Sequence, residues 1–361
     1  MPGPPNSSRS IQASLALLLE RFHDGQPAAL ARAISVVESE REGFQDLLHR
    51  VLQRGPVARR VGLTGPPGAG KSSLLAALAT AYRQQGDRVG VVAVDPTSPY
   101  SGGALLGDRI RMNDLATDPG IFIRSMASRG SMGGLATTTK EVLDLMDRFG
   151  FEHVLVETVG VGQTELDITS AADTVVVVLV PESGDAIQAM KAGLMEIADV
   201  FVVNKADRPG SARLVKEIRQ ALHLREGSAL RDVPVHHGVD LGGVGKGAVG
   251  AGVAAEPVAQ QDVPWEVPVL TTNALTGGGI PELLEAIDGH RAWLEASGEL
   301  AVRRRARARR RIRDVVDREL RRAAWSAPGT TTRVDAGLDR IGAGEATPYS
   351  VAREILDTLL R

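Results

Sequence analysis

The strongest chemical pattern in this sequence of 361 residues is a phosphate-binding motif, G-x-x-x-x-G-K-[ST], that begins at Gly65 and has no gap. Glycines in such a loop let successive backbone N–H groups point inward and hold phosphate oxygens at the N-terminus of the following helix. We expect Lys71 to bridge the β- and γ-phosphates of a nucleoside triphosphate, and the Ser72 hydroxyl to bind Mg²⁺. The predicted nucleotide-binding residues of this loop are Gly65, Pro66, Pro67, Gly68, Ala69, Gly70, Lys71, Ser72 and Ser73.

A second motif, N-K-x-D from Asn204, follows directly on an apolar run and bears on the choice of base. The Asp207 carboxylate can accept hydrogen bonds from the ring N–H and the exocyclic amine of guanine, whereas adenine offers no such pair of donors. Lys205 can lay its stem along the face of the base, and Asn204 can tie this loop to the phosphate loop. Thr272, Asn273 and Ala274, at the end of the last strand, are placed to support the base through the Ala274 N–H. The two motifs together predict GTP rather than ATP.

Acidic residues at the ends of two further strands suit a magnesium site and switch loops. Glu157 ends one strand, from which its carboxylate should reach Mg²⁺ through a water. The N–H of Gly160 should sense the γ-phosphate, so that hydrolysis releases this loop. Asp95 and Asp108 lie on a Gly-rich loop predicted beside the phosphates, where carboxylate oxygens are natural Mg²⁺ ligands.

The elements that must position these residues follow from short β-rich runs that alternate with helical patterns from about residue 57. This alternation predicts an α/β fold of the P-loop NTPase type, with a mostly parallel sheet flanked by helices. The predicted strands are 60–64, 88–94, 121–124, 153–157, 174–180, 200–204 and 267–271. The predicted helices include 71–85, 137–149, 186–197 and 211–222.

Helical extensions are expected on both sides of this nucleotide-binding domain, which is placed at 57–280. The Pro- and Ser-rich residues 1–10 are expected to form a disordered tail, and 11–56 a helical N-terminal extension. A Gly-rich stretch at 236–263 is expected to be a flexible insertion in the domain. Residues 281–361 are expected to form a helical C-terminal arm.

The composition excludes several other kinds of chemistry. The chain has no cysteine, which removes disulfides, zinc–cysteine sites and thiol catalysis, and which fits a reducing compartment. A formal net charge of −2 argues against a protein that coats nucleic acid or an anionic membrane. The first ten residues lack the features of a secretory signal, and no apolar run is long enough to span a bilayer. We expect a cytoplasmic protein with neither nucleic acid nor membrane as a partner.

Two local features have more than one interpretation. Eight of the eleven residues from Arg303 to Arg313 are arginine, which would suit nucleic acid. Interleaved aromatic residues for base stacking are missing and acidic residues follow from Asp314, so a solvated helix that pairs with a partner helix is favoured. His236 and His237 are the first two residues of the Gly-rich insertion, and a solvated surface pair is favoured over a metal site.

These residues together resemble the MeaB/ArgK/MMAA-type GTPases, which are chaperones of cobalamin-dependent acyl-CoA mutases. Three stretches carry the resemblance: V-D-P-T-S from Val94 with Gly102-Gly103 and L-G-D-R from Leu106, E-T-V-G-V-G-Q-T-E from Glu157, and Gly184–Glu196 leading into the N-K-x-D motif. The match runs from about residue 11 to 235 and resumes near Trp265, so it covers nearly all the chain. The insertion at 236–263 is longer than the family pattern needs.

The resemblance implies a complete ligand set and three switches. The Mg²⁺ ligands would be Ser72, Asp95, Asp108 and Glu157. The loops near 95–109 and 157–165 would be the first and second switches, and 182–193 a third that contacts the mutase. Asp185 and Lys191 are candidates for relaying the nucleotide state to that partner.

The resemblance also implies partners and a task. The C-terminal helices would form a homodimer arm, in agreement with the interpretation of the Arg-rich stretch. The implied task is to gate delivery of adenosylcobalamin to an acyl-CoA mutase, most commonly methylmalonyl-CoA mutase, and to help release damaged cofactor. GTP or GDP and Mg²⁺ would be the bound cofactors.

Hydrolysis at such a site is mainly electrostatic, because backbone N–H groups, Lys71 and Mg²⁺ stabilise charge on the transferring phosphoryl group. A water must also be positioned. Ras-like enzymes use a Gln directly after the glycine of the second switch, but Val161 occupies that place here and Gln163 lies two residues further on. We therefore expect slow intrinsic hydrolysis that a partner accelerates, with Lys71, Glu157 and Gln163 as the catalytic residues.

Other functions remain open. A kinase or ATPase linked to amino-acid transport would prefer ATP to GTP. A scaffold would bind nucleotide yet hold a dimeric partner in a way that GTP and GDP leave unchanged. Metal-delivery GTPases of the UreG and HypB type are relatives, but a chain with no cysteine and seven histidines lacks their usual ligands.

Overall fold

The computed structural model describes residues 6–53, 55–95, 115–127, 137–158, 167–181, 193–227 and 264–359. The chain divides into two compact units, Met1–Arg304 and Arg305–Arg361. The first unit holds all the described strands, and the described part of the second consists of helices joined by short non-helical segments.

The first unit is built on a seven-stranded sheet in which every neighbouring pair of strands runs parallel. The strands are β1 (Arg59–Thr64), β2 (Val89–Asp95), β3 (Ile121–Ala127), β4 (His153–Glu157), β5 (Thr174–Leu179), β6 (Val200–Asn204) and β7 (Val269–Thr272). Their order in space is β3-β2-β4-β1-β5-β6-β7. Every residue of β4, β5 and β6 is buried, as expected for parallel strands covered on both faces. The predicted parallel α/β fold is confirmed.

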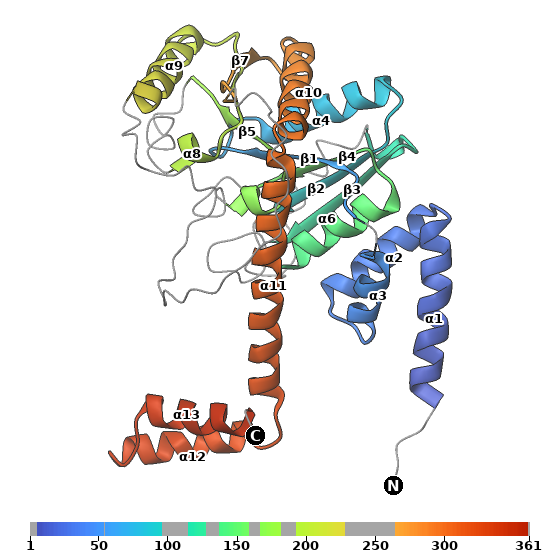
Figure 1. Ribbon diagram of the computed structural model, residues 1–361, viewed down its shortest axis with the longest axis vertical. Coiled ribbons are helices and arrows are strands. Elements are labelled where there is room, and N and C mark those ends of the chain that lie inside the picture. Colours follow the sequence, from blue (N-terminus) through green and yellow to red (C-terminus); the bar gives the residue numbers. More distant parts are fainter. Residues whose placement is uncertain are drawn as a thin grey trace, which may run out of the picture. The chain divides into compact units, whose positions relative to one another are not determined.

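Helices cover both faces of this sheet (Figure 1). One face packs against α4 (Lys71–Gln84) and α10 (Ile280–Ala296). The other packs against α6 (Thr137–Phe149) and α9 (Ser211–Gly227). Side chains alternate between the two cores along β4, since Leu155 belongs to the α4 side and Val154 and Val156 to the α6 side. The two cores hold in place the strands whose ends carry the predicted site.

Three helices precede the sheet and share the core of α6: α1 (Asn6–His23), α2 (Pro27–Glu38) and α3 (Phe44–Val51). The rings of Phe22 and Phe149 meet edge to face with centroids 5.3 Å apart. α1 begins at Asn6, inside the segment 1–10 for which a disordered tail is expected from sequence. Asn and Ser are favoured at helix starts, and this pair directly follows a proline, which explains the earlier start.

A buried histidine lies at the end of the sheet where the strands begin. The ring of His153 stacks on Tyr82 with centroids 3.7 Å apart, and its Nε2 is 3.0 Å from Oδ2 of Asp87. Burial lowers the pKa of His153 below its ordinary value, and the neighbouring carboxylate opposes this only in part. Burial also raises the pKa of Tyr82 well above its usual range. The fold therefore favours the neutral form of both side chains.

The C-terminal helices divide between the two units. Leu283 and Ile287 of α10 belong to the core beneath α4, because apolar residues recur on one face of this helix. The sheet domain therefore extends beyond residue 280, where the sequence alone places its end, and the helical arm begins later. The remaining helices are α11 (Glu299–Ser326), α12 (Thr330–Gly342) and α13 (Pro348–Leu359). A Cβ at Gly337 would lie 2.6 Å from the Val351 side chain, so α12 and α13 approach closely.

Two further short elements are η1 (Leu115–Thr117) and α8 (Met195–Ile197). α8 is the described end of the helix predicted at 186–197. Residues 186–192 and the predicted insertion at 236–263 lie outside the described residues. Among the residues described, no helix is both long enough and apolar enough to cross a membrane.

Candidate functional site: a phosphate loop and a base-recognition loop

The phosphate loop connects β1 to α4 and needs glycine at two positions. Gly65 has φ +132°, and a Cβ there would lie 2.1 Å from the Val178 carbonyl oxygen of β5. Gly70 has φ +84°, and a Cβ there would lie 2.4 Å from Nδ2 of Asn204. Left-handed backbone and close packing both exclude a side chain. The loop therefore lies against the ends of two strands, β5 and β6.

Lys71 is the first residue of α4, and its ammonium group lies within the curve of the loop. Its Nζ donates hydrogen bonds to the carbonyl oxygens of Gly65 at 2.9 Å and Pro66 at 3.1 Å. The side chain is buried, with 5% of the residue exposed. A cation and a helix N-terminus thus meet at one point, an arrangement that binds phosphate.

Ser72 and Glu157 converge from two different elements on a buried contact. The Ser72 hydroxyl donates a hydrogen bond of 2.9 Å to Oε1 of Glu157, at the end of β4. Glu157 pairs in register with Ala93 of β2, and Asp95 ends that strand two residues further on. Three of the four predicted metal ligands therefore belong to neighbouring elements at one end of the sheet, and hydroxyl and carboxylate oxygens suit Mg²⁺. Asp108, the fourth, lies outside the described residues.

Asn204 joins the base-recognition loop to the phosphate loop, as the sequence predicts. Its Nδ2 donates to the Ala69 carbonyl oxygen at 2.9 Å. Its Oδ1 accepts from the Thr272 hydroxyl at 3.1 Å and from the Ala274 N–H at 3.2 Å. Two donors on Oδ1 fix the orientation of the amide, so that its NH₂ group faces the phosphate loop.

This contact corrects one expected role and adds a role for Thr272. The Ala274 N–H, expected to support the base directly, here donates to Asn204, because β7 ends beside the Asn204 amide. Thr272, to which the sequence assigns no separate role beside Asn273, is buried and orients Asn204 through its hydroxyl. Its one sequence signal is a hydroxyl residue directly before Asn273 at the end of a strand.

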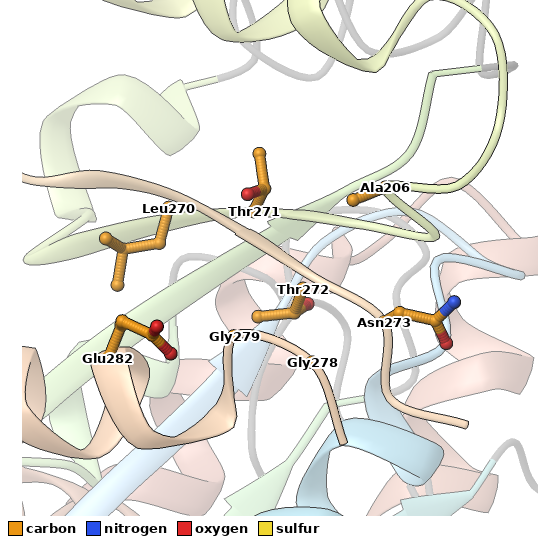
Figure 2. A pocket seen from close by; sticks show the side chains of 8 residues that line it. All are labelled: Ala206, Leu270, Thr271, Thr272, Asn273, Gly278, Gly279 and Glu282. Atoms are coloured by element: carbon orange, nitrogen blue, oxygen red, sulfur yellow. The ribbon is translucent and has the colours of Figure 1, made fainter. Parts of the chain in front are cut away.

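The side chains that would recognise guanine are also brought together. Nδ2 of Asn273 donates a hydrogen bond of 2.8 Å to Oδ1 of Asp207. Nζ of Lys205 donates at 2.9 Å to the Gly68 carbonyl oxygen, and the Lys205 backbone has φ +57°. Figure 2 shows a hollow beside this loop, with Asn273 at one end and Glu282 at the other. The predicted base-binding residues thus form one surface with the phosphate loop.

The second switch is described only where it starts. The Thr158 hydroxyl donates at 3.0 Å to the hydroxyl of Thr64, the residue before the phosphate loop. The predicted sensor Gly160 and the predicted catalytic residue Gln163 lie outside the described residues. So do residues 182–192 of the predicted third switch, including Asp185 and Lys191. The roles given to these residues remain predictions.

A parallel sheet with a phosphate loop after β1, a carboxylate at the end of β4 and an N-K-x-D motif after β6 defines a P-loop GTPase. The sequence matches the family described as methylmalonyl-CoA mutase-associated GTPase MeaB over residues 30–329. The chain belongs to this family, as its motifs predict.

Individual proteins agree with this assignment. The chain is 44% identical over 343 residues to a putative GTPase of Pyrococcus horikoshii, covering 95% of this chain and 98% of that protein. It is 36% identical over 294 residues to the methylmalonic aciduria type A homolog, mitochondrial, of Mus musculus, covering 78% of this chain and 64% of that protein. The crystal structure of a LAO/AO transport system kinase is similar with a TM-score of 0.63 and 26% identity, covering 97% and 98% of the two chains. The protein is therefore a GTPase, an enzyme that hydrolyses GTP.

Proposed function

We propose that this GTPase is a chaperone that gates adenosylcobalamin loading, protection or reactivation of an acyl-CoA mutase, with methylmalonyl-CoA mutase as its client. The observation that carries the proposal is the match to a family described as associated with that mutase, over residues 30–329. The relative from Mus musculus, named for methylmalonic aciduria type A, supports the same client.

The nucleotide site supports GTP-dependent control. Lys71 and the N-terminus of α4 would bind the phosphates, and Asp207, held by Asn273, would bind guanine. Ser72, Glu157, Asp95 and Asp108 would hold Mg²⁺, which would neutralise charge that develops on the phosphates. In this mechanism the residues of the chain bind and orient the nucleotide. Slow hydrolysis follows because Val161 occupies the place of the water-positioning Gln, and the client would accelerate it by ordering the switches.

A second copy of the chain is the proposed partner of the C-terminal arm. Ile312, Val316 and Leu320 of α11 recur every four residues and are 66%, 49% and 58% exposed. Leu338 and Leu356 on α12 and α13 are also exposed. A helical face of large apolar side chains is stabilised when another helix covers it. Sedimentation of the Leu320→Glu variant tests for this dimer, with Asp317→Asn on the same helix as the matched control. A dimer that Leu320→Glu leaves unaffected would contradict the proposed partner.

Co-sedimentation with purified methylmalonyl-CoA mutase tests the client. We expect a complex whose affinity differs at least about fivefold between GDP and a non-hydrolysable GTP analogue, which corresponds to about 1 kcal/mol of coupling. Lys71→Ala, which loses nucleotide binding, should make the two conditions alike. No complex, or one of equal affinity with both nucleotides in the wild type, would count against the chaperone role.

A kinase or ATPase linked to amino-acid transport is the second candidate, because the similar crystal structure is that of a LAO/AO transport system kinase. The pairing of Asp207 with Asn273 favours guanine instead, since an orientated carboxylate accepts from the two guanine donors. Competition of ATP and GTP for the site decides between them, and a preference for ATP would support the transport-linked function.

A further inference from the structure

The beginning of α11 makes a set of polar contacts with the sheet domain. No residue of this 28-residue helix, as the structure describes it, is buried, and Val302 in its first turn is 60% exposed. Helices in globular proteins are normally held by an apolar face. Since no residue of α11 is fully buried, we expect its polar contacts to carry much of its attachment.

Arg303 makes the first set of these contacts. Its Nη1 and Nη2 both lie 3.0 Å from Oδ1 of Asp199, and Nη1 also lies 3.0 Å from Oδ2. Nη1 donates further to the carbonyl oxygen of Asp173 at 3.1 Å. Burial alone would lower the pKa of Arg303, but the charges and hydrogen bonds of Asp199 and Glu299 together outweigh it and raise the pKa. The guanidinium group is therefore charged and paired inside the domain.

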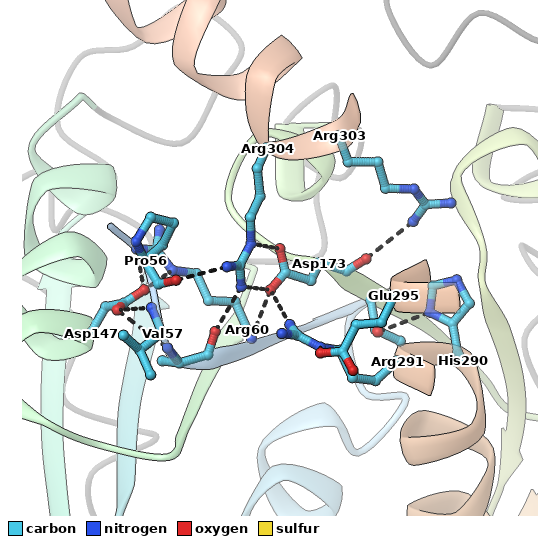
Figure 3. Close-up of polar contacts among 12 residues, drawn as sticks. Pro56, Val57, Arg60, Asp147, Asp173, His290, Arg291, Glu295, Arg303 and Arg304 are labelled. Atoms are coloured by element: carbon cyan, nitrogen blue, oxygen red, sulfur yellow. Dashed lines mark hydrogen bonds and ion pairs between the residues drawn. The ribbon is translucent and has the colours of Figure 1, made fainter. Parts of the chain in front are cut away.

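Arg304 makes the second set, as Figure 3 shows. Its Nη2 lies 2.7 Å from Oδ2 of Asp173, whose side chain is 1% exposed, and its Nε lies 3.3 Å from Oδ1. Its Nη1 and Nη2 also donate to the carbonyl oxygens of Pro56 at 2.9 Å and Ala58 at 3.0 Å. Arg291 of α10 shares the same carboxylate at 3.1 Å. A planar guanidinium group can make this many directed bonds, and an ammonium group cannot.

The two carboxylates stand at the starts of neighbouring strands. Asp173 directly precedes β5 and Asp199 directly precedes β6. The opposite ends of β5 and β6 contact the phosphate loop, through Val178 against Gly65 and through Asn204. The beginning of α11 is thus joined to the two strands that support the nucleotide loops, at the end of the sheet away from those loops.

We propose that Arg303 and Arg304, paired with Asp199 and Asp173, form an ionic cluster that fixes the start of α11 to β5 and β6. Loss of this cluster releases the start of α11 while the sheet domain stays folded. The start of α11, up to Arg304, then depends on charge pairing for its attachment to these strands. This inference goes beyond the proposed function and holds whichever client the GTPase serves.

Hydrogen exchange of the full-length protein, followed by mass spectrometry, tests the cluster in the variant Arg303→Met/Arg304→Met. We expect amides 299–306 to exchange at least about tenfold faster than in the wild type, with α4 and β1 unchanged and GDP affinity within about twofold. Arg305→Met is the matched control, because Arg305 is an exposed arginine of the same helix. Unchanged exchange at 299–306, or an equal change in the control, would overturn the proposal.

A second variant covers the case in which the double variant does not fold. Arg304→Lys keeps the positive charge but loses the planar group that reaches a carboxylate and two carbonyl oxygens. We expect faster exchange at 299–306 by several-fold, in a protein that still binds GDP. Exchange equal to that of the wild type would contradict the cluster, and so would loss of GDP binding, because the contacts would then hold the domain and not the helix.

Discussion

Nδ2 of Asn273 donates a hydrogen bond of 2.8 Å to Oδ1 of Asp207, and so joins the loop after β7 to the loop after β6. Oδ1 of Asn273 accepts from the N–H groups of Leu275 at 3.1 Å and Thr276 at 3.2 Å, which fixes the direction of its amide. Asp207 is therefore held with one oxygen occupied, and its orientation is set before a base arrives.

Asn273→Ala should weaken guanine recognition, because Asp207 would lose the donor that orients it. Hydrogen bonds to charged groups contribute about 1.5–3 kcal/mol, and exposure of this pair reduces that, so we expect about five- to tenfold weaker GDP binding. Titration with a fluorescent GDP, with ADP as competitor, measures both affinity and selectivity. Gln220→Ala on α9 is the control. Unchanged selectivity in Asn273→Ala would show that the pair has no part in choosing the base.

Thr272→Val should weaken nucleotide binding by about three- to tenfold, because a neutral hydrogen bond contributes about 1 kcal/mol and its loss frees the Asn204 amide to turn. The neighbouring Thr271→Val, on the same strand, is a matched control that should bind as the wild type does. Calorimetric titration with GDP measures the difference. Equal affinities for the two variants would remove the positioning role of Thr272.

Ser72→Ala should lower GTP hydrolysis by about a hundredfold, because removal of one group that stabilises the transition state costs that much in comparable sites. It also leaves the buried Glu157 carboxylate without its hydrogen bond at 2.9 Å. The Mg²⁺ dependence of the rate should move to higher concentration. Thr80→Ala, on an exposed position of the same helix, is the control, and a normal rate in Ser72→Ala would contradict the ligand assignment.

The pH dependence of stability should contain a contribution from His153. Its pKa is lowered in the folded protein by burial, so below about pH 6.5 the unfolded chain binds the proton more readily. His153 therefore makes its full contribution to the free energy of unfolding above about pH 6.5. This contribution is lost as the pH falls toward the pKa of His153 in the folded protein, and the free energy of unfolding then decreases by at most about 1.4 kcal/mol per pH unit. Denaturant unfolding of His153→Gln from pH 8 to 5 should show a smaller loss than the wild type. The exposed His49→Gln serves as the control, and parallel curves for all three proteins would exclude this contribution.

The sheet and the phosphate loop could be predicted because their signals are local. β4, β6 and α6 have the predicted ends, since buried β-branched runs and an amphipathic pattern define them within a few residues. β2 begins at Val89 and ends at Asp95, one residue later at each end than the predicted 88–94. α9 begins at Ser211 as predicted but continues past residue 222 to Gly227. The phosphate loop needs glycine at Gly65 and Gly70 for backbone reasons that the sequence displays directly.

Long-range contacts between side chains could not be predicted in the same way. The sequence of the Arg-rich stretch predicts a solvated helix, yet its first two residues pair with Asp199 and Asp173, each more than a hundred positions earlier. Nothing in the sequence separates Arg303 from the exposed arginines that follow. The orientation of Asn204 by Thr272 likewise depends on where two parallel strands end relative to one another.

The rate of GTP hydrolysis by the purified protein, measured with and without methylmalonyl-CoA mutase and with ATP in parallel, tests the central claim most directly. We predict slow hydrolysis of GTP alone, strong acceleration by the mutase and negligible turnover of ATP. A GTP rate that the mutase leaves unchanged would contradict the proposed client, and faster turnover of ATP than of GTP would contradict the assignment of the base.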